Sequence, residues 1–223
     1  MDDFNDSRFS KDLKIQKLNF LEGGDVDESL IENHLIRLSK HPIGELSTDP
    51  QKIAFWINVY NGLTNTLIIQ RKIRKSMMTN PTVFFIPKFD VGGYQFSLDD
   101  IEHGILRKNV RAPYKPWGQF SSWDKRKQFL VEKVDYRIHF ALNCGAKSCP
   151  PIAFYSVEYL EKELAMAEES FNAQYWLVDE EKKEIQCSLI HKSYKNDFGD
   201  KYLNDKRYQG FKVKLLKYDW GVV

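Results

Sequence analysis

The chain has 223 residues, of which 42% are hydrophobic and 14% are aromatic, and this is ample material for a buried core. Its 33 basic and 31 acidic residues give a formal net charge of +2, a balance that favours neither nucleic acid nor an anionic membrane as a partner. The longest apolar runs are far shorter than the ~20 residues of a membrane-spanning helix. We therefore expect a soluble globular protein that binds no nucleic acid and crosses no membrane.

The start of the chain and its cysteine content bear on the compartment. The first residues lack the positive and apolar segments of a signal peptide. We therefore expect the protein in the cytoplasm, or in the periplasm or outside the cell if a signal peptide has been trimmed away. Three cysteines cannot all pair within one chain, and a domain of this size needs no disulfide for stability. Reduced thiols are the simpler expectation, with a Cys144–Cys149 bridge as the alternative.

Two helices are predicted in the first third of the chain. In residues 27–38 apolar side chains recur at helical spacing, and Pro42 follows the segment. A longer helical pattern covers residues 50–72, with Asp49 as the expected N-cap and Pro50 at the first helical position.

Three asparagines lie along one side of the longer helix. Asn58, Asn61 and Asn65 are three and four residues apart, which places them on one line among apolar neighbours. That line should face something polar. A buried ladder of hydrogen bonds is one interpretation, and a catalytic role for Asn58 and Asn61 is the other.

A hairpin, a capped helix and a long loop are predicted next. Residues 89–96 contain two short apolar segments around a pair of glycines, which suits a tight turn with positive φ. Ser97 and Asp100 have the spacing of a capping box, so we expect a helix over residues 98–107. Residues 109–127 show no clean period and are typical of a long ordered loop.

The second half of the chain is predicted to contain mostly strands. Side chains alternate between apolar and more polar over residues 136–143, which indicates a strand. The other predicted elements are a helix from Ser156 to about residue 172, a hairpin that joins residues 175–178 to 185–189, and a last strand over 211–218.

No repeat, low-complexity tract or linker divides the chain. We therefore predict an α+β fold of a single domain, in which a helical N-terminal part packs on a mostly antiparallel sheet. Residues 1–48 would form a helical extension of a main domain over residues 49–223.

Several fragments together resemble the family catalogued as domain of unknown function 547. They span residues 53 to 220, and they are Phe55–Asn61, Ser97–Arg107, Arg137–Pro151, Lys195–Gly199 and Tyr218–Trp220. The chain departs from the family pattern at its end, where Gly221-Val222-Val223 replaces Leu-Asn, and before Arg137, where Val134-Asp135-Tyr136 replaces the more usual Asp-Pro. The resemblance implies the domain but no reaction. Because plant and animal members append this domain to other modules, it also implies a scaffold or recognition role.

A cysteine-dependent hydrolase or transferase needs a thiolate and an imidazole that exchanges its proton. Cys149 precedes two prolines, and a place at a first helical turn would put its thiol near backbone amides that favour the thiolate. Cys144, which precedes a glycine at an expected strand end, is the rival nucleophile. His103 is the preferred base, because His139 lies between two apolar neighbours in the predicted strand.

Glu102, Asn58 and Asn61 complete the predicted catalytic group. Adjacent helical residues point about 100° apart, so Glu102 is expected to supply a second carboxylate function and not to orient His103. Either asparagine could orient the imidazole or donate to an oxyanion. The order of histidine before cysteine differs from papain and suits a distant, circularly permuted papain-like fold.

Three alternatives stand beside the hydrolase. A non-catalytic binding module would use the aromatic segment 114–117 and the asparagines as a ligand groove. Zinc would use His103, His139, Cys144 and Cys149, although their spacing is not that of a structural zinc site. A thiol redox protein is the third alternative, although the four residues between the cysteines depart from the two-residue spacing of thiol redox centres. The expected partner is a small molecule or peptide of unknown identity, no cofactor is predicted, and the oligomeric state is left open.

Overall fold

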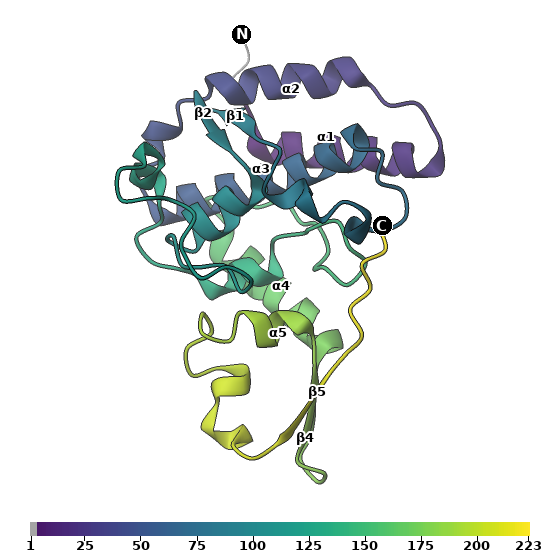
Figure 1. Ribbon diagram of the computed structural model, residues 1–223, viewed down its shortest axis with the longest axis vertical. Coiled ribbons are helices and arrows are strands. Elements are labelled where there is room, and N and C mark those ends of the chain that lie inside the picture. The colour runs from purple at the N-terminus through teal and green to yellow at the C-terminus, as the bar shows by residue number, and fades with distance from the viewer. Residues whose placement is uncertain (1–3) are drawn as a thin grey trace.

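A computed structural model describes residues 4–223 and has the predicted α+β fold (Figure 1). Its α-helices and strands, in chain order, are α1 (Asp6–Glu22), α2 (Glu28–Lys40), α3 (Asp49–Gln70), β1 (Phe89–Val91), β2 (Tyr94–Phe96), α4 (Leu160–Tyr175), β3 (Trp176–Asp179), β4 (Glu184–Cys187), α5 (Leu189–Ser193) and β5 (Lys212–Leu215). A π-helix covers Asp100–Leu106, and short 3₁₀-helices cover Ile43–Glu45, Met77–Thr79, Pro81–Phe84, Lys125–Phe129, Tyr136–Phe140, Tyr202–Asn204 and Lys206–Tyr208.

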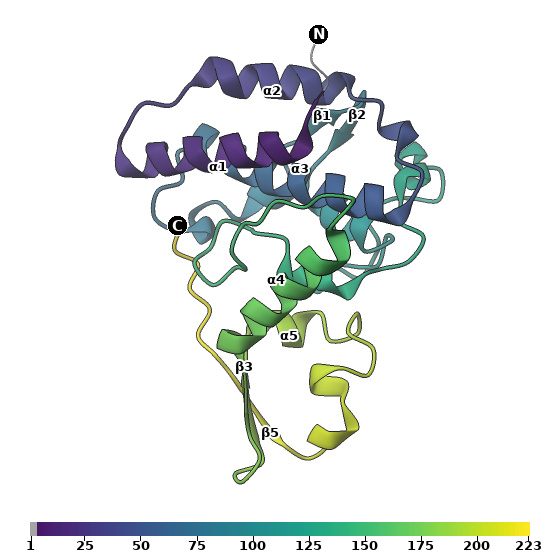
Figure 2. The ribbon, with the colours of Figure 1, turned by 180° about the vertical axis from the view of Figure 1, so that it is seen from behind.

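Helix α3 is the centre of the main hydrophobic core. Its residues are buried without interruption from Lys52 to Ile69, and a helix that is buried all round must be covered on every side. Helix α1 packs along one side, as Figure 2 shows, and α2 lies against β1. Gly62 permits the close approach of α1, because a Cβ there would lie 2.6 Å from Cδ1 of Phe9.

The start of α3 is fixed by a capping box one residue earlier than predicted. The Thr48 hydroxyl accepts a hydrogen bond from the Gln51 backbone N–H, and the Gln51 side chain accepts one from the Thr48 N–H. The N-cap is therefore Thr48 and not Asp49. The helix over residues 27–38 is confirmed as α2, whose N-cap is Asp27.

The C-terminal part of the chain forms a smaller unit below the main core (Figure 1). Strand β3 pairs antiparallel with β4, as predicted, and β4 pairs in parallel with β5. The aromatic side chains of Phe140, Phe171 and Phe198 form a second core cluster there. The last strand is shorter than the predicted range 211–218 because the chain leaves the sheet after Leu215.

The strand predicted over residues 136–143 is wrong. This segment begins as the 3₁₀-helix Tyr136–Phe140, whose first turn is capped by the Asp135 carboxylate at 2.9 Å from the Arg137 nitrogen. Consecutive residues from Ile138 to Phe140 are all buried, so the alternation in the sequence does not reflect two faces of a sheet. Helix α4 likewise begins at Leu160, four residues after the predicted cap Ser156.

Within residues 4–223, no helix combines the length and the apolar character that a membrane crossing requires.

Candidate functional site

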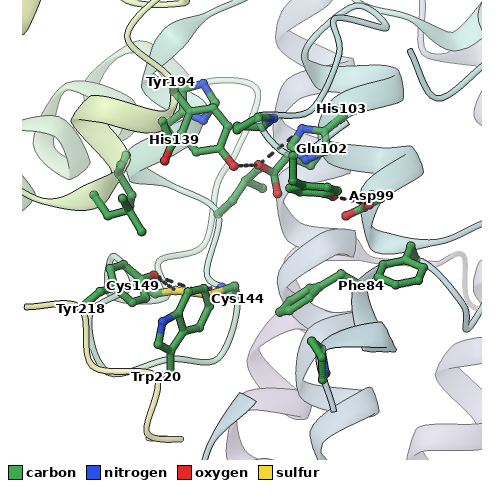
Figure 3. A pocket seen from close by; sticks show the side chains of 18 of the residues that line it. Phe84, Asp99, Glu102, His103, His139, Cys144, Cys149, Tyr194, Tyr218 and Trp220 are labelled. Carbon is green, nitrogen blue, oxygen red and sulfur yellow. Dashed lines mark hydrogen bonds and ion pairs between the residues drawn. A yellow bond between two sulfur atoms is a disulfide. The ribbon is translucent and has the colours of Figure 1, made fainter. Parts of the chain in front are cut away.

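A cavity of about 530 Å³ lies between the π-helix, the loop that carries Cys144 and Cys149, and the C-terminal segment (Figure 3). Most of its wall is apolar. The aromatic side chains that line it are Tyr60, Phe84, Phe85, Tyr114, Tyr194, Tyr218 and Trp220. The acidic and histidine side chains that line it are Asp99, Glu102, His103 and His139, and the cysteine pair lines it as well.

A disulfide forms one side of the cavity. Cys144 and Cys149 are joined, in place of the reduced thiols that were the simpler expectation. The Tyr218 hydroxyl lies 3.2 Å from the sulfur of Cys149 and 3.7 Å from that of Cys144, and the backbone N–H of Cys144 donates to the Cys149 sulfur at 3.2 Å. Cys149 is 8% exposed, whereas Cys144 is half-buried. The two cysteines therefore differ in exposure, and their sulfurs differ in hydrogen bonding.

Two asparagines of α3 hold the cysteine loop by its backbone. The Asn61 side chain accepts from the Asn143 N–H at 2.8 Å and donates to the carbonyl of Ala141 at 3.1 Å. Asn58 makes the same two-way contact with Tyr155, accepting from its N–H at 3.1 Å and donating to its carbonyl at 2.7 Å. Both asparagines are fully buried and lie outside the cavity wall. They position the loop from behind.

The backbone of the turn after Asn143 requires a glycine at position 145. Gly145 has a φ of +88°, and a Cβ there would lie 2.7 Å from Cδ1 of Ile68. The Asn143 side chain accepts from the Gly145 N–H at 2.8 Å and donates to the carbonyl of Pro150 at 2.6 Å. Glycine is therefore needed both for the backbone conformation and for the approach to α3.

The opposite side of the cavity is formed by the π-helix. It begins with the predicted capping box, in which Ser97 and Asp100 bond each other's backbone N–H at 3.0 and 3.1 Å. Glu102 accepts hydrogen bonds from the hydroxyls of Tyr194 at 2.6 Å and Tyr60 at 3.2 Å. Burial opposes ionisation of this carboxyl, but it is outweighed by the charge that His103 carries at the low pH where the carboxyl titrates, by the Tyr194 hydrogen bond and by the charges of His139 and Arg107, so the pKa of Glu102 is lowered.

His103 is neutral at neutral pH. Burial lowers the pKa of its imidazole to about 4, and the charge of Arg107 opposes protonation further, against the attraction of Glu102. The guanidinium of Arg107 lies 3.0 Å from Nδ1 of His103. Because a guanidinium can only donate, Nδ1 is the acceptor and the ring proton lies on Nε2. His103 is thus a weak base at pH 7.

A buried ion pair supports this side of the cavity. Arg107 contacts Asp197 through two hydrogen bonds of 2.6 and 3.1 Å, and His139 donates from Nε2 to the same carboxylate at 2.8 Å. Burial would raise the pKa of Asp197, but these hydrogen bonds hold it far below its usual range. The Tyr194 ring stacks on His139 with 3.8 Å between ring centroids. Asp197 therefore fixes the orientation of both neighbours.

The long loop over residues 109–127 also contributes to the cavity. Its Tyr114 donates a hydrogen bond to Asp99, the residue immediately before the π-helix. Burial raises the pKa of Asp99 to about 7, against the lowering effect of the Tyr114 hydrogen bond and with a further rise from the charge of Glu102. Asp99 is therefore partly protonated at neutral pH, while Glu102 is ionised.

Most of the residues singled out in the sequence meet in this cavity, namely Cys144, Cys149, Glu102 and His103. Within residues 4–223 the hydrogen-bond partners of the two sulfurs are Tyr218 and a backbone amide, and neither partner is an imidazole. In the same part of the chain, no group of three or more His, Cys, Asp and Glu side chains is arranged to hold a metal ion. The zinc alternative therefore finds no ligand group in this geometry.

The sequence interpretation missed Arg107, Tyr194, Asp197 and Tyr218. A signal for three of them was present, because Arg107, Asp197 and Tyr218 lie inside fragments that resemble the family. The sequence does not show that these residues meet in space, since Arg107 and Asp197 are 90 residues apart along the chain.

The sequence model of a family described as "Protein of unknown function, DUF547" matches residues 43–171. This match confirms the resemblance for the three fragments that lie within it, Phe55–Asn61, Ser97–Arg107 and Arg137–Pro151. The matched range contains the π-helix and both cysteines, whereas Asp197 and Tyr218 follow it. Comparisons with curated proteins and with solved structures found no match.

Proposed function

Since the chain belongs to the DUF547 family, whose function is unknown, we propose from the site alone that the protein carries out thiol–disulfide exchange with a small molecule or peptide in the cavity. The carrying observation is that two donors, the Cys144 N–H and the Tyr218 hydroxyl, converge on the Cys149 sulfur. Hydrogen bonds to a sulfur stabilise its thiolate, and a stabilised thiolate is a good leaving group.

The exchange uses the difference between the two sulfurs. An incoming thiolate attacks the half-buried Cys144, a new S–S bond forms there, and Cys149 leaves as a thiolate held by its two donors. A second thiolate then attacks the substrate sulfur of this mixed disulfide. The products are a substrate disulfide and the Cys144 thiolate, so the protein gains two electrons and the substrate pair loses two. The reverse sequence reduces a substrate disulfide.

The cysteine-dependent hydrolase is a second proposal. Once the bridge is reduced, the same two donors would stabilise Cys149 as a nucleophile. The absence of an imidazole contact to either sulfur within residues 4–223, together with the neutral and weakly basic His103, makes the exchange reaction the better supported of the two.

The test is to equilibrate the folded protein with glutathione buffers of graded potential and to alkylate the free thiols. Peptide mass spectrometry then reports Cys144 and Cys149 separately, with the buried Cys187 as the internal reference. We expect both cavity thiols to become alkylated together while Cys187 stays protected. Reduction only after unfolding would reject the exchange proposal. Turnover of ester or amide substrates by the reduced protein alone would favour the hydrolase.

A further inference from the structure

We infer that the cavity binds a cationic ligand, an ammonium group on an apolar body, with Glu102 as its counter-ion and the aromatic side chains as its walls. The inference rests on the proposed exchange reaction in one respect only, that the ligand also carries the sulfur that reacts. The binding of the cation depends on the cavity alone. Its arguments are the charge balance, the chemistry of the walls and one unpartnered imidazole nitrogen.

The charge balance of the cavity is negative. Glu102 lines it as a carboxylate, whereas the two histidines that line it have lowered pKa values and are neutral at pH 7. The nearest guanidinium, Arg107, is bound by both oxygens of Asp197 and is itself 3% exposed. An anionic ligand would therefore be repelled by the Glu102 carboxylate without a free cation in the wall to bind it, while a cation would neutralise the carboxylate.

The walls favour a cation with an apolar body. Seven aromatic side chains line the cavity. Tyr60 and Tyr194 donate to Glu102, and Tyr114 donates to Asp99. Trp220 lies near the disulfide (Figure 3). Ring faces carry a negative partial charge that attracts ammonium groups, and Trp and Tyr do so better than Phe. Little polar surface remains for a neutral polar ligand.

The imidazole of His103 supplies an independent observation. Its Nδ1 accepts from Arg107, so Nε2 carries the proton, and within residues 4–223 this nitrogen has no hydrogen-bond partner. The side chain is nevertheless only 2% exposed and borders the cavity. This donor opens onto the cavity, so an acceptor on a bound ligand can reach it. We assign that acceptor to the ligand, as an oxygen close to its ammonium group.

The test uses probes that carry no sulfur, and it uses the oxidised protein. Benzylammonium, benzyl alcohol and benzoate have similar size and differ in charge, and calorimetry measures their Kd values. We expect benzylammonium to bind at least about tenfold more tightly than benzyl alcohol, and benzoate not to bind. Glu102→Gln keeps an acceptor for the Tyr194 hydroxyl but removes the charge, so it should abolish the preference. The exposed Glu169→Gln, which makes the same charge change elsewhere, should retain it.

Equal binding of the cation and the alcohol, or a preference that survives in Glu102→Gln, would overturn the inference. If Glu102→Gln does not fold, the three probes and the salt dependence of benzylammonium binding to the unaltered protein decide alone, because a charge preference weakens with ionic strength. The thiol buffers of the exchange experiment do not enter these measurements. The two proposals can therefore fail separately.

Discussion

Within residues 4–223, Tyr218 is the side chain within hydrogen-bond distance of both sulfurs of the disulfide, at 3.2 Å from Cys149 and 3.7 Å from Cys144. Burial, together with the negative charge of Glu102, raises the pKa of its hydroxyl well above the ordinary value. The hydroxyl therefore stays protonated and able to donate at neutral pH. After reduction it would favour the thiolate form of Cys149.

Replacing Tyr218 with Phe should therefore raise the pKa of the Cys149 thiol in the reduced protein. A hydrogen bond to a charged group contributes ~1.5–3 kcal/mol, which corresponds to about one to two pH units. The pH dependence of iodoacetamide labelling at Cys149 measures this change. Tyr159→Phe, at a tyrosine that is 54% exposed, is the matched control. An unchanged profile in Tyr218→Phe would show that the hydroxyl does not stabilise the thiolate.

Asp99 should make the protein less stable as the pH rises. Its pKa is 3.8 as a free side chain and about 7 in the folded protein, so the folded state holds its proton more tightly. The stabilisation that follows from this is complete below pH ~4 and is lost as the pH rises through about 7, by up to ~4 kcal/mol.

We expect the excess in free energy of unfolding of Asp99→Asn, which cannot ionise, over the unaltered protein to be larger at pH 8.5 than at pH 5, where part of the stabilisation remains. Urea denaturation at the two pH values measures the difference. Asp25→Asn, at an exposed carboxylate, should not change the pH dependence. The same fall in stability between pH 5 and 8.5 in Asp99→Asn would assign the effect to another group.

At the scale of elements, the contact of α1 with α3 depends on Gly62. We expect Gly62→Ala to destabilise the protein, because its Cβ would lie 2.6 Å from Cδ1 of the fully buried Phe9. Overpacking of this kind costs ~1–3 kcal/mol, and the better helix propensity of alanine offsets up to ~1 kcal/mol. Urea denaturation should show a net loss of about 1–2 kcal/mol.

The control for this substitution is Gly44→Ala, where an added Cβ meets nothing within 4 Å. Its stability should stay within ~0.5 kcal/mol of the unaltered protein. If Gly62→Ala were as stable as Gly44→Ala, α1 would have to be able to shift on α3.

The elements that could be predicted from the sequence are those with local signals. The helical period gave α2 and α3, the pair Gly92-Gly93 with φ of +59° and +80° gave the β1–β2 hairpin, and the capping box gave the start of the π-helix. The strand predicted over residues 136–143 was wrong because the conformation of this segment depends on residues far away in the sequence. His139, predicted on a half-polar face, is buried against Asp197, 58 residues away.

The candidate site divides in the same way. Residue type and local spacing were sufficient to single out the cysteines, Glu102 and His103. They could not show that Nδ1 of His103 accepts a hydrogen bond from Arg107. They also could not show that the asparagine side chains form hydrogen bonds with the cysteine loop and not with a substrate. Both facts depend on which backbone and side-chain groups the fold brings together.

At the scale of the whole molecule, the C-terminal segment returns from the sheet to the main core (Figure 1). Its Trp220 carbonyl accepts from the Met77 N–H at 3.0 Å, and its Gly221 carbonyl accepts from the Lys147 N–H at 2.7 Å. The Ser148 hydroxyl accepts from the Asp219 N–H at 2.8 Å. The segment thus holds the cysteine loop from one side, while α3 holds it from the other.

We therefore expect reduction of the disulfide to destabilise the fold only modestly. The bridge closes a short loop, for which the entropic contribution is ~2 kcal/mol, and the hydrogen bonds on both sides of the loop remain. Urea denaturation with and without a phosphine reductant measures the loss of unfolding free energy. The double variant Cys144→Ser, Cys149→Ser should show no response to the reductant. Complete unfolding on reduction would mean that the bridge, and not the hydrogen bonds, maintains the loop.

The two-way contacts of Asn58 and Asn61 have a consequence for the kinetics of the bridge. They pair with the loop backbone much as a neighbouring strand would, with one donor and one acceptor at each position. The approach of the two sulfurs is therefore already restricted when the chain folds, and reclosing the bridge after reduction requires little further loss of entropy. The reduced protein would then present its thiols at a high effective concentration to each other, and it could open and reclose the bridge repeatedly without rearranging the cavity.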